Sequence, residues 1–166
     1  MDNFLPLALE LAAEYHYDQA DKAGKPYVLH LLRVMFNLNT DDEELMSIAI
    51  LHDILEDTIM DRNSLSKYAF SGRIIDGVES ITKRNSETYQ KYLERVALNP
   101  DAILVKLADL KDNMDLSRLS KLTEKDLKRQ EKYSKARAFL VKSATELGIK
   151  VKPERPSIRH IKEGNT

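Results

Sequence analysis

The chain has 166 residues, of which 42% are hydrophobic and 32% charged, with 5 Gly, 5 Pro and no Cys. This length and composition suit one globular domain and argue against a disordered chain, and the lack of Cys excludes disulfides and thiolate metal sites. The formal net charge of −1 gives no general attraction to nucleic acid, so we expect no nucleic-acid partner.

The N-terminal segment MDNFLPLALELAAEY has apolar residues at helical spacing, but it lacks a basic start and carries Asp2, Glu10 and Glu14. It matches neither a secretory signal nor a membrane-spanning helix, and we therefore expect no contact with a membrane. The absence of Cys fits a cytoplasmic location, which is the location we predict.

Apolar periodicity and capping signals predict helices along the whole chain, and no segment alternates as a strand does. The expected helices cover residues 3–20, 30–37, 40–58, 63–70, 72–83, 87–98, 101–115 and 123–147. The signals for their ends are Thr40 with Glu43, Asn85 with Ser86, Asn99 with Pro100, Thr123 with Asp126, and Gly148. We therefore predict an all-α fold with a single domain over residues 1–150, followed by an extended or mobile tail over residues 151–166.

The segment from Thr40 to Asp61 contains eight carboxylates and no Lys or Arg. Its first four acids suit the N-terminus of a helix, where the dipole favours negative charge. His52, Asp53, Glu56 and Asp57 need another explanation, because on a continuous helix they share one arc opposite an apolar arc. Clustered carboxylates without basic neighbours raise one another's pKa values or hold a cation. The alternative is an acidic surface with an incidental His.

A second acid lies in the nearly continuous apolar run of residues 101–115, which predicts a central helix. Asp109 interrupts this run, and Asn113 follows it one turn later on the same face. A buried carboxylate must be hydrogen-bonded, paired or bound to metal, so either a metal or an ion pair with Lys106 explains Asp109. His30 has apolar neighbours at Leu29, Leu31 and Leu32, and taken alone such a His is more often a core residue than a ligand.

Taken in order, His30, His52-Asp53 and Asp109 resemble the ligand series of the HD superfamily of metal-dependent phosphohydrolases. More narrowly, the chain resembles the hydrolase domain of the Rel/Spo alarmone (ppGpp) enzymes and their small single-domain relatives. The resemblance covers about residues 5–120, and the matching stretches are HYDQADKAGKPYVLH (His16–His30), AILHDILEDT (Ala49–Thr58), GVESITKR (Gly77–Arg84) and AILVKLADLKDNM (Ala102–Met114).

This resemblance implies an HD-domain helical bundle that hydrolyses a nucleotide, most closely as a ppGpp 3′-pyrophosphohydrolase. It implies that one divalent ion, usually Mn²⁺, is held by the metal ligands His30, His52, Asp53 and Asp109. Glu56 and Asp57 match the pair that positions and activates the attacking water. The expected substrate contacts are Asn113, the cations Lys22, Lys25, Lys83 and Arg84, and Tyr89, which could instead be a core or surface residue.

Two positions depart from the resembled pattern, because Asp21 and Leu110 stand where the alarmone hydrolases usually have Arg. An HD nucleotidase acting on another nucleotide or a phosphorylated metabolite therefore stays an alternative. A non-catalytic metal-binding regulator is another, although the Glu56-Asp57 pair favours an enzyme. A helical interaction module that uses the charged helix 123–147 is a third, and this helix could also support a homo-oligomer.

Overall fold

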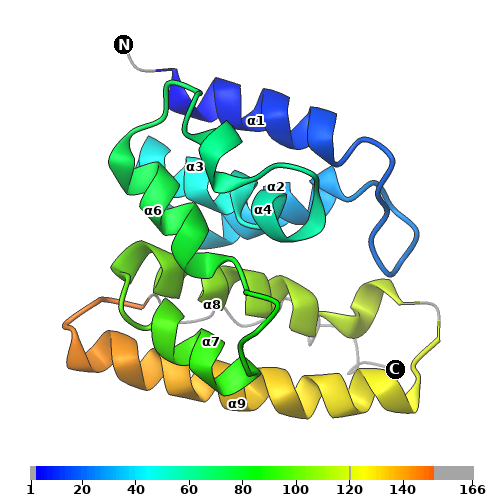
Figure 1. Cartoon of the computed structure of the whole chain (residues 1–166). Helices are drawn as coiled ribbons and strands as arrows, with labels where there is room; N and C mark the ends of the chain where they lie inside the picture. Colours follow the sequence, from blue (N-terminus) through cyan, green and yellow to red (C-terminus); the bar gives the residue numbers. More distant parts are fainter. Residues whose placement is uncertain (1–2, 120, 152–166) are drawn as a thin grey trace, which may run out of the picture.

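The computed structural model describes residues 3–119 and 121–151 (Figure 1). Its helices are α1 (Phe4–Tyr15), α2 (Val28–Leu38), α3 (Glu43–Leu51), α4 (Ile54–Asp57), α5 (Arg62–Leu65), α6 (Gly72–Ile81), α7 (Tyr89–Val96), α8 (Pro100–Met114), the 3₁₀ helix η1 (Leu116–Arg118) and α9 (Glu124–Glu146). The bridge between Ala20 and Pro26 is the one strand-like pairing in these ranges. The all-α prediction is confirmed. Of the tail predicted for residues 151–166, all but Val151 lies outside the described residues.

Helix α8 lies at the centre of the bundle and packs against α2, α3, α6, α7 and α9. It lies between the layer that contains α1, α2 and α3 and the long helix α9 (Figure 1). Its side chains Ile103, Val105 and Leu110 are fully buried. The apolar run of residues 101–115 therefore does form the central helix that its composition predicts. Within the described ranges, no helix combines the length and the apolar character needed to cross a bilayer.

Several predicted helix ends are confirmed and others are wrong. Asn99 caps α8 with Pro100 at its first position, and Thr123 forms a capping box with Asp126 at the start of α9. Gly148 follows α9 with φ +69°, a left-handed conformation that glycine adopts without strain. At the starts of α3 and α7, the N-cap is a different residue from the predicted one.

The wrong caps lie before α3 and α7. Asp42 caps α3, accepting hydrogen bonds from the backbone N–H groups of Glu44 and Leu45, because this helix begins two residues later than a capping box at Thr40 requires. The hydroxyl of Thr40 instead accepts from the backbone N–H of Asp42. Thr88, and neither Asn85 nor Ser86, caps α7.

The helix expected over residues 40–58 is divided into α3 and α4, with His52 and Asp53 in the turn between them. Consecutive side chains on a regular helix point about 100° apart. At this break, Nε2 of His52 and Oδ2 of Asp53 approach to 3.0 Å. The prediction of one continuous helix is therefore wrong, and the turn brings the two side chains to the same point.

Candidate metal centre

The four predicted ligands come from three separate segments and converge on one point. His30 lies on α2, His52 and Asp53 lie between α3 and α4, and Asp109 lies on α8. Nε2 of His30 is 3.3 Å from Oδ1 of Asp109 and 3.8 Å from Oδ2 of Asp53. Nε2 of His52 is 3.0 Å from Oδ2 of Asp53 and 3.7 Å from Oδ1 of Asp109. Ligand atoms of His30, His52 and Asp109 all lie within 4.8 Å of one another, which makes a possible metal site.

Hydrogen bonds on the far side of each ring set the orientation of the two imidazoles. Nδ1 of His30 is 2.7 Å from Oδ2 of Asp112, and Nδ1 of His52 is 2.7 Å from the carbonyl oxygen of Ala49. Both partners are acceptors, so Nδ1 carries the proton in each ring. In the neutral rings the lone pairs of both Nε2 atoms therefore face Asp53 and Asp109.

His52 tests whether these residues suit a metal ion. Its side chain is 1% exposed, and among the described residues its Nε2 has no hydrogen-bond partner. A buried lone pair directed at two carboxylates is unfavourable unless a proton or a metal cation lies between them. Two imidazole nitrogens and two carboxylate oxygens form a donor set that a divalent ion such as Mn²⁺ or Zn²⁺ accepts. The residues therefore fit a divalent metal.

The negative charge of the cluster also stabilises a proton on His52. Burial by itself lowers the pKa of His52, but the carboxylates of Asp53 and Asp109 outweigh burial and raise it to about 10. Burial raises the pKa of Asp53, but the charge of the protonated His52 imidazole and the hydrogen bond that it then donates to the carboxylate outweigh burial and bring the value to about 2. The site thus holds an excess of negative charge that stabilises positive charge placed among the four side chains.

Asp109 uses both of its oxygens. Its Oδ2 forms an ion pair of 2.8 Å with Nζ of Lys106, while Oδ1 faces the imidazoles and accepts a hydrogen bond from the amide of Asn113. The ion pair that could have explained a buried Asp109 is present, and it leaves Oδ1 directed at the cluster. Asn113, predicted as a substrate contact, is therefore hydrogen-bonded to Asp109, a predicted metal ligand.

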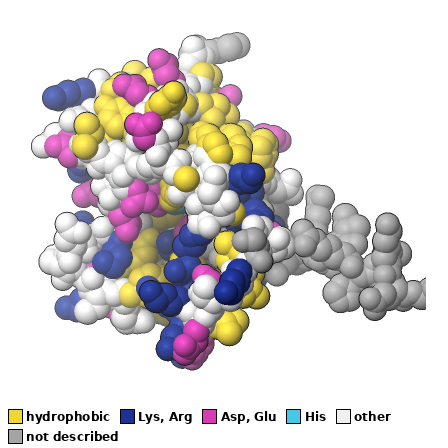
Figure 2. All heavy atoms as spheres, turned by 90° about the vertical axis from the view of Figure 1, so that its right-hand side faces the viewer, with side chains coloured by type: hydrophobic (Ala, Val, Ile, Leu, Met, Phe, Trp, Pro, Cys, Tyr) yellow, Lys and Arg dark blue, Asp and Glu magenta, His cyan; other side chains and the backbone are white. Residues whose placement is uncertain are grey.

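A cavity of about 390 Å³ opens beside the cluster. Of the predicted residues, it is lined by His30, Asp53, Asp109, Glu56, Lys22 and Asn113. The loop that precedes α2 and the first turns of α9 complete its wall, the latter with Arg129 and Tyr133. Figure 2 shows Lys and Arg side chains gathered around a hollow in one face of the molecule. The lining combines five Lys and Arg side chains with seven carboxylates, so an anionic ligand would need the basic side chains together with a metal ion at the carboxylates.

The two predicted catalytic acids differ in their surroundings. Glu56 lines the cavity, and its Oε2 accepts a hydrogen bond of 2.9 Å from the backbone N–H of Lys83. Asp57 is not among the residues that line the cavity, and its Oδ2 lies 3.5 Å from the hydroxyl of Tyr27. Burial raises the pKa of both carboxyl groups, and the charge of Asp53 raises it further.

Four of the predicted substrate contacts do not line this cavity. They are Lys25, Lys83, Arg84 and Tyr89. The ring of Tyr89 packs against Tyr92 with a centroid distance of 5.8 Å, and Nζ of Lys132 lies 3.8 Å from its centroid. These surroundings agree with the alternative that Tyr89 belongs to the core, and a substrate contact for any of the four residues stays a prediction.

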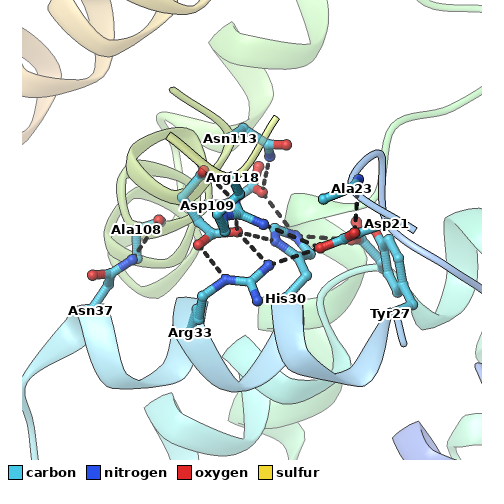
Figure 3. Close-up of polar contacts among 12 residues, drawn as sticks. Asp21, Ala23, Tyr27, His30, Arg33, Asn37, Ala108, Asp109, Asn113 and Arg118 are labelled. Atoms are coloured by element: carbon cyan, nitrogen blue, oxygen red, sulfur yellow. Dashed lines mark hydrogen bonds and ion pairs between the residues drawn. The ribbon is translucent and has the colours of Figure 1, made fainter. Parts of the chain in front are cut away.

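The sequence analysis missed a set of side chains that surround the predicted ligands. They are Tyr27, which donates to Asp53, Asp112, which contacts His30, and Arg33 and Arg118, which both contact Asp112. Arg33 and Arg118 point toward His30 and Asp21 (Figure 3). A local signal existed for Asp112 and Arg33, because they follow Asp109 and His30 by three residues on the same helices. No local signal existed for Arg118.

Comparison with known proteins agrees with this geometry. The chain is 37% identical over 117 residues to a guanosine-3′,5′-bis(diphosphate) 3′-pyrophosphohydrolase of Aquifex aeolicus, covering 64% of this chain and 17% of that protein. It is 32% identical over 144 residues to a GTP pyrophosphokinase of Streptomyces antibioticus, covering 80% of this chain and 16% of that protein. The chain therefore spans about a sixth of the length of these relatives.

A solved structure of a metazoan ortholog of SpoT, described as hydrolysing ppGpp, matches with a TM-score of 0.69 and 23% identity. The match covers 90% of this chain and 98% of that chain, so the two share one fold over nearly their whole length. No model of a known protein family matches the chain. The helical fold and the sequence matches together make this chain a homologue of the HD hydrolase domain of the Rel/Spo proteins.

Proposed function

We propose that this protein is a metal-dependent phosphohydrolase that removes pyrophosphate from the 3′ position of guanosine 3′,5′-bis(diphosphate). The observation that carries the proposal is the convergence of two buried Nε2 atoms and two carboxylates beside a cavity with basic side chains. Relatives named for this activity or for GTP pyrophosphokinase activity support the choice of substrate.

His30, His52, Asp53 and Asp109 would hold one divalent ion, and we propose Mn²⁺ because the site combines imidazole with carboxylate oxygens. When bound, such an ion lowers the pKa of water and neutralises charge on phosphoryl oxygens. Tyr27 and Asp112 hold Asp53 and His30 from outside the cluster. The ligands are therefore already placed before an ion arrives.

Glu56 is the proposed acceptor of the proton from the attacking water. In the reaction, the oxygen of water forms a bond to the phosphorus next to the 3′ oxygen, the bond from that phosphorus to the 3′ oxygen breaks, and the 3′ oxygen takes up a proton. The raised pKa of Glu56 improves it as a base, and the backbone N–H of Lys83 fixes its orientation. Asp57 would be the second acid of the pair, although it does not line the cavity and its Oδ2 lies 3.5 Å from the hydroxyl of Tyr27.

The phosphate groups require cations, and Lys22 on the cavity wall is the first candidate. Asn113 would contact the sugar or the pyrophosphate, since it lines the cavity next to Asp109. Lys25, Lys83 and Arg84 would bind phosphates that extend past the cavity. A base contact by Tyr89 is part of the same proposal.

A second candidate function is hydrolysis of another nucleotide. It is favoured by the two positions where the resembled enzymes usually carry Arg. Leu110 is fully buried and cannot contact a ligand, and the carboxylate of Asp21 is engaged with Arg33 and Arg118. The pocket therefore lacks a cationic side chain at each of these two positions, which lowers the expected affinity for a substrate with four phosphates.

One substrate panel tests both candidates. The purified protein is incubated with Mn²⁺ and, separately, guanosine 3′,5′-bis(diphosphate), GTP and nucleoside monophosphates, and the products are separated by ion-exchange chromatography. We expect GDP and pyrophosphate from the first substrate. Orthophosphate or free nucleosides from the others, with the first substrate intact, would establish the second candidate. We place the reaction in the cytoplasm, in keeping with a chain that has no Cys.

A further inference from the structure

Asp112 lies directly behind the metal ligand His30. It is on α8, almost one turn after Asp109, and is 5% exposed. Its Oδ2 is 2.7 Å from Nδ1 of His30, while Nε2 on the other side of the ring is 3.3 Å from Oδ1 of Asp109. The imidazole is therefore held between two acids of the same helix, one on each nitrogen.

Two arginines hold Asp112 in place. Nε of Arg33 donates to its Oδ1 at 2.7 Å, and Nη2 of Arg118 donates to its Oδ2 at 3.0 Å. Arg118 also donates to the backbone carbonyl of Asp112 at 2.9 Å. A buried carboxylate is costly unless its charge is paired and its lone pairs are used, and here both conditions are met. The carboxylate is thus fixed by groups from α2 and η1 as well as by its own helix.

The same arginines reach the loop that precedes α2. Oδ2 of Asp21 is 3.3 Å from Arg33 and 3.1 Å from Arg118, and its Oδ1 accepts hydrogen bonds from the backbone N–H groups of Ala23 and Lys25. Asp21 therefore does not present a free charge to the cavity. It anchors the loop that carries Lys22 to the network around Asp112 (Figure 3).

We propose that Asp112 is a positioning residue that orients His30 and raises the affinity of the centre for its metal. A carboxylate on the outer nitrogen of a ligating His fixes the tautomer and the direction of the ring and makes the inner nitrogen a better donor. Loss of such a partner typically weakens metal binding by about 10–100-fold. The proposal rests on the metal centre of the proposed function and not on the substrate.

The rival explanation is that Asp112 serves only the fold, by joining α2, α8 and η1. That role would lower the free energy of unfolding but would leave the metal affinity of the folded protein unchanged. Asp101 offers a matched control, because it lies on the same helix and pairs with a guanidinium through two hydrogen bonds of 2.8 Å, to Arg73. It does not line the metal cavity.

The experiment measures Mn²⁺ binding by isothermal titration calorimetry in the full chain after chelator treatment and dialysis. The proteins are the wild type, D112A, D112N and D101N, each checked for a cooperative thermal transition. We expect affinity to fall about 10–100-fold in D112A and less in D112N, whose amide oxygen still accepts from His30. We expect D101N to bind as the wild type does. If D112A is unfolded, the comparison of D112N with D101N tests the proposal. D112N must then bind Mn²⁺ more weakly than D101N does.

Equal affinity of the folded Asp112 variants and the wild type would overturn this inference and leave the proposed function intact. If the Mn²⁺ affinities of the variants follow the expected order but the wild type hydrolyses no nucleotide, the inference is supported and the proposed function is overturned. Failure of the wild type to bind any Mn²⁺ would overturn both.

Discussion

The hydroxyl of Tyr27 donates a hydrogen bond of 2.5 Å to Oδ2 of Asp53. That oxygen is also the one nearest to Nε2 of His52, at 3.0 Å. The ring of Tyr27 packs against His16 and His30, with centroid distances of 5.2 and 5.3 Å. One side chain therefore orients a predicted ligand through its hydroxyl and contacts another through its ring.

Replacing Tyr27 with Phe should weaken metal binding while leaving the fold intact. The ring contacts remain, but Asp53 loses the donor that fixes its carboxylate, and outer partners of this kind affect metal affinity by about 10-fold or more. Calorimetric titration with Mn²⁺ measures the effect. Tyr92→Phe is the control, because it removes the hydrogen bond of a buried Tyr to the carbonyl of Ile81 at 2.7 Å. It should cost about 1 kcal/mol of stability and leave the affinity unchanged.

Asp53→Ala and Glu56→Gln should separate metal binding from turnover. The first change removes a predicted ligand, so the purified variant should retain no stoichiometric metal in elemental analysis. The second keeps the ligand set and removes the proposed base, so it should bind metal like the wild type and lose about 10²–10⁴-fold in kcat. Full activity of Glu56→Gln would show that another group accepts the proton.

Gly77→Ala should destabilise the contact between α3 and α6. A Cβ atom at this position would lie 2.5 Å from Cδ1 and 3.0 Å from Cγ1 of Ile48, which is fully buried. Overpacking of this kind typically costs about 1–3 kcal/mol, against a gain in helix propensity of about 1 kcal/mol. Urea unfolding measures the balance, which we expect to be a net loss. Gly72→Ala is the control, since a Cβ there meets no atom within 4 Å.

The ion-pair network of Arg73 should make stability depend on pH in acid. Burial raises the pKa of Asp42, but hydrogen bonds from Arg73 and from backbone amides outweigh it and lower the pKa below its usual value. A lowered folded-state pKa stabilises the protein above the unfolded value of about 3.9, and this contribution is lost as the pH falls through the folded-state pKa.

Arg73→Gln removes part of this contribution. The variant should be about 1 kcal/mol less stable than the wild type at pH 7, and the difference should shrink toward pH 3. Urea unfolding of metal-free protein at several pH values measures it. A difference that stays constant from pH 7 to pH 3 would contradict the assignment to an ion pair.

Much of the fold could be predicted from local patterns. The apolar run around Leu107 predicts a central helix, and Asn99, Thr123 and Gly148 mark helix ends through side-chain and backbone chemistry that needs no distant partner. The order of His30, His52-Asp53 and Asp109 predicts the possible ligand set in the same way, because a sequence pattern records residue types and their spacing.

The tertiary structure alone decided how those side chains meet. The helix over residues 40–58 is interrupted at His52, where burial against the neighbouring helices prevails over local helix propensity. Asp112, Arg33 and Arg118 form one network although Arg118 is 97 residues from its partner Asp21. Contacts over such distances depend on the packing of α2 against α8, which periodicity within a single helix does not encode. The sequence thus determined which residues could bind a metal, and the packed helices determined that they face one another.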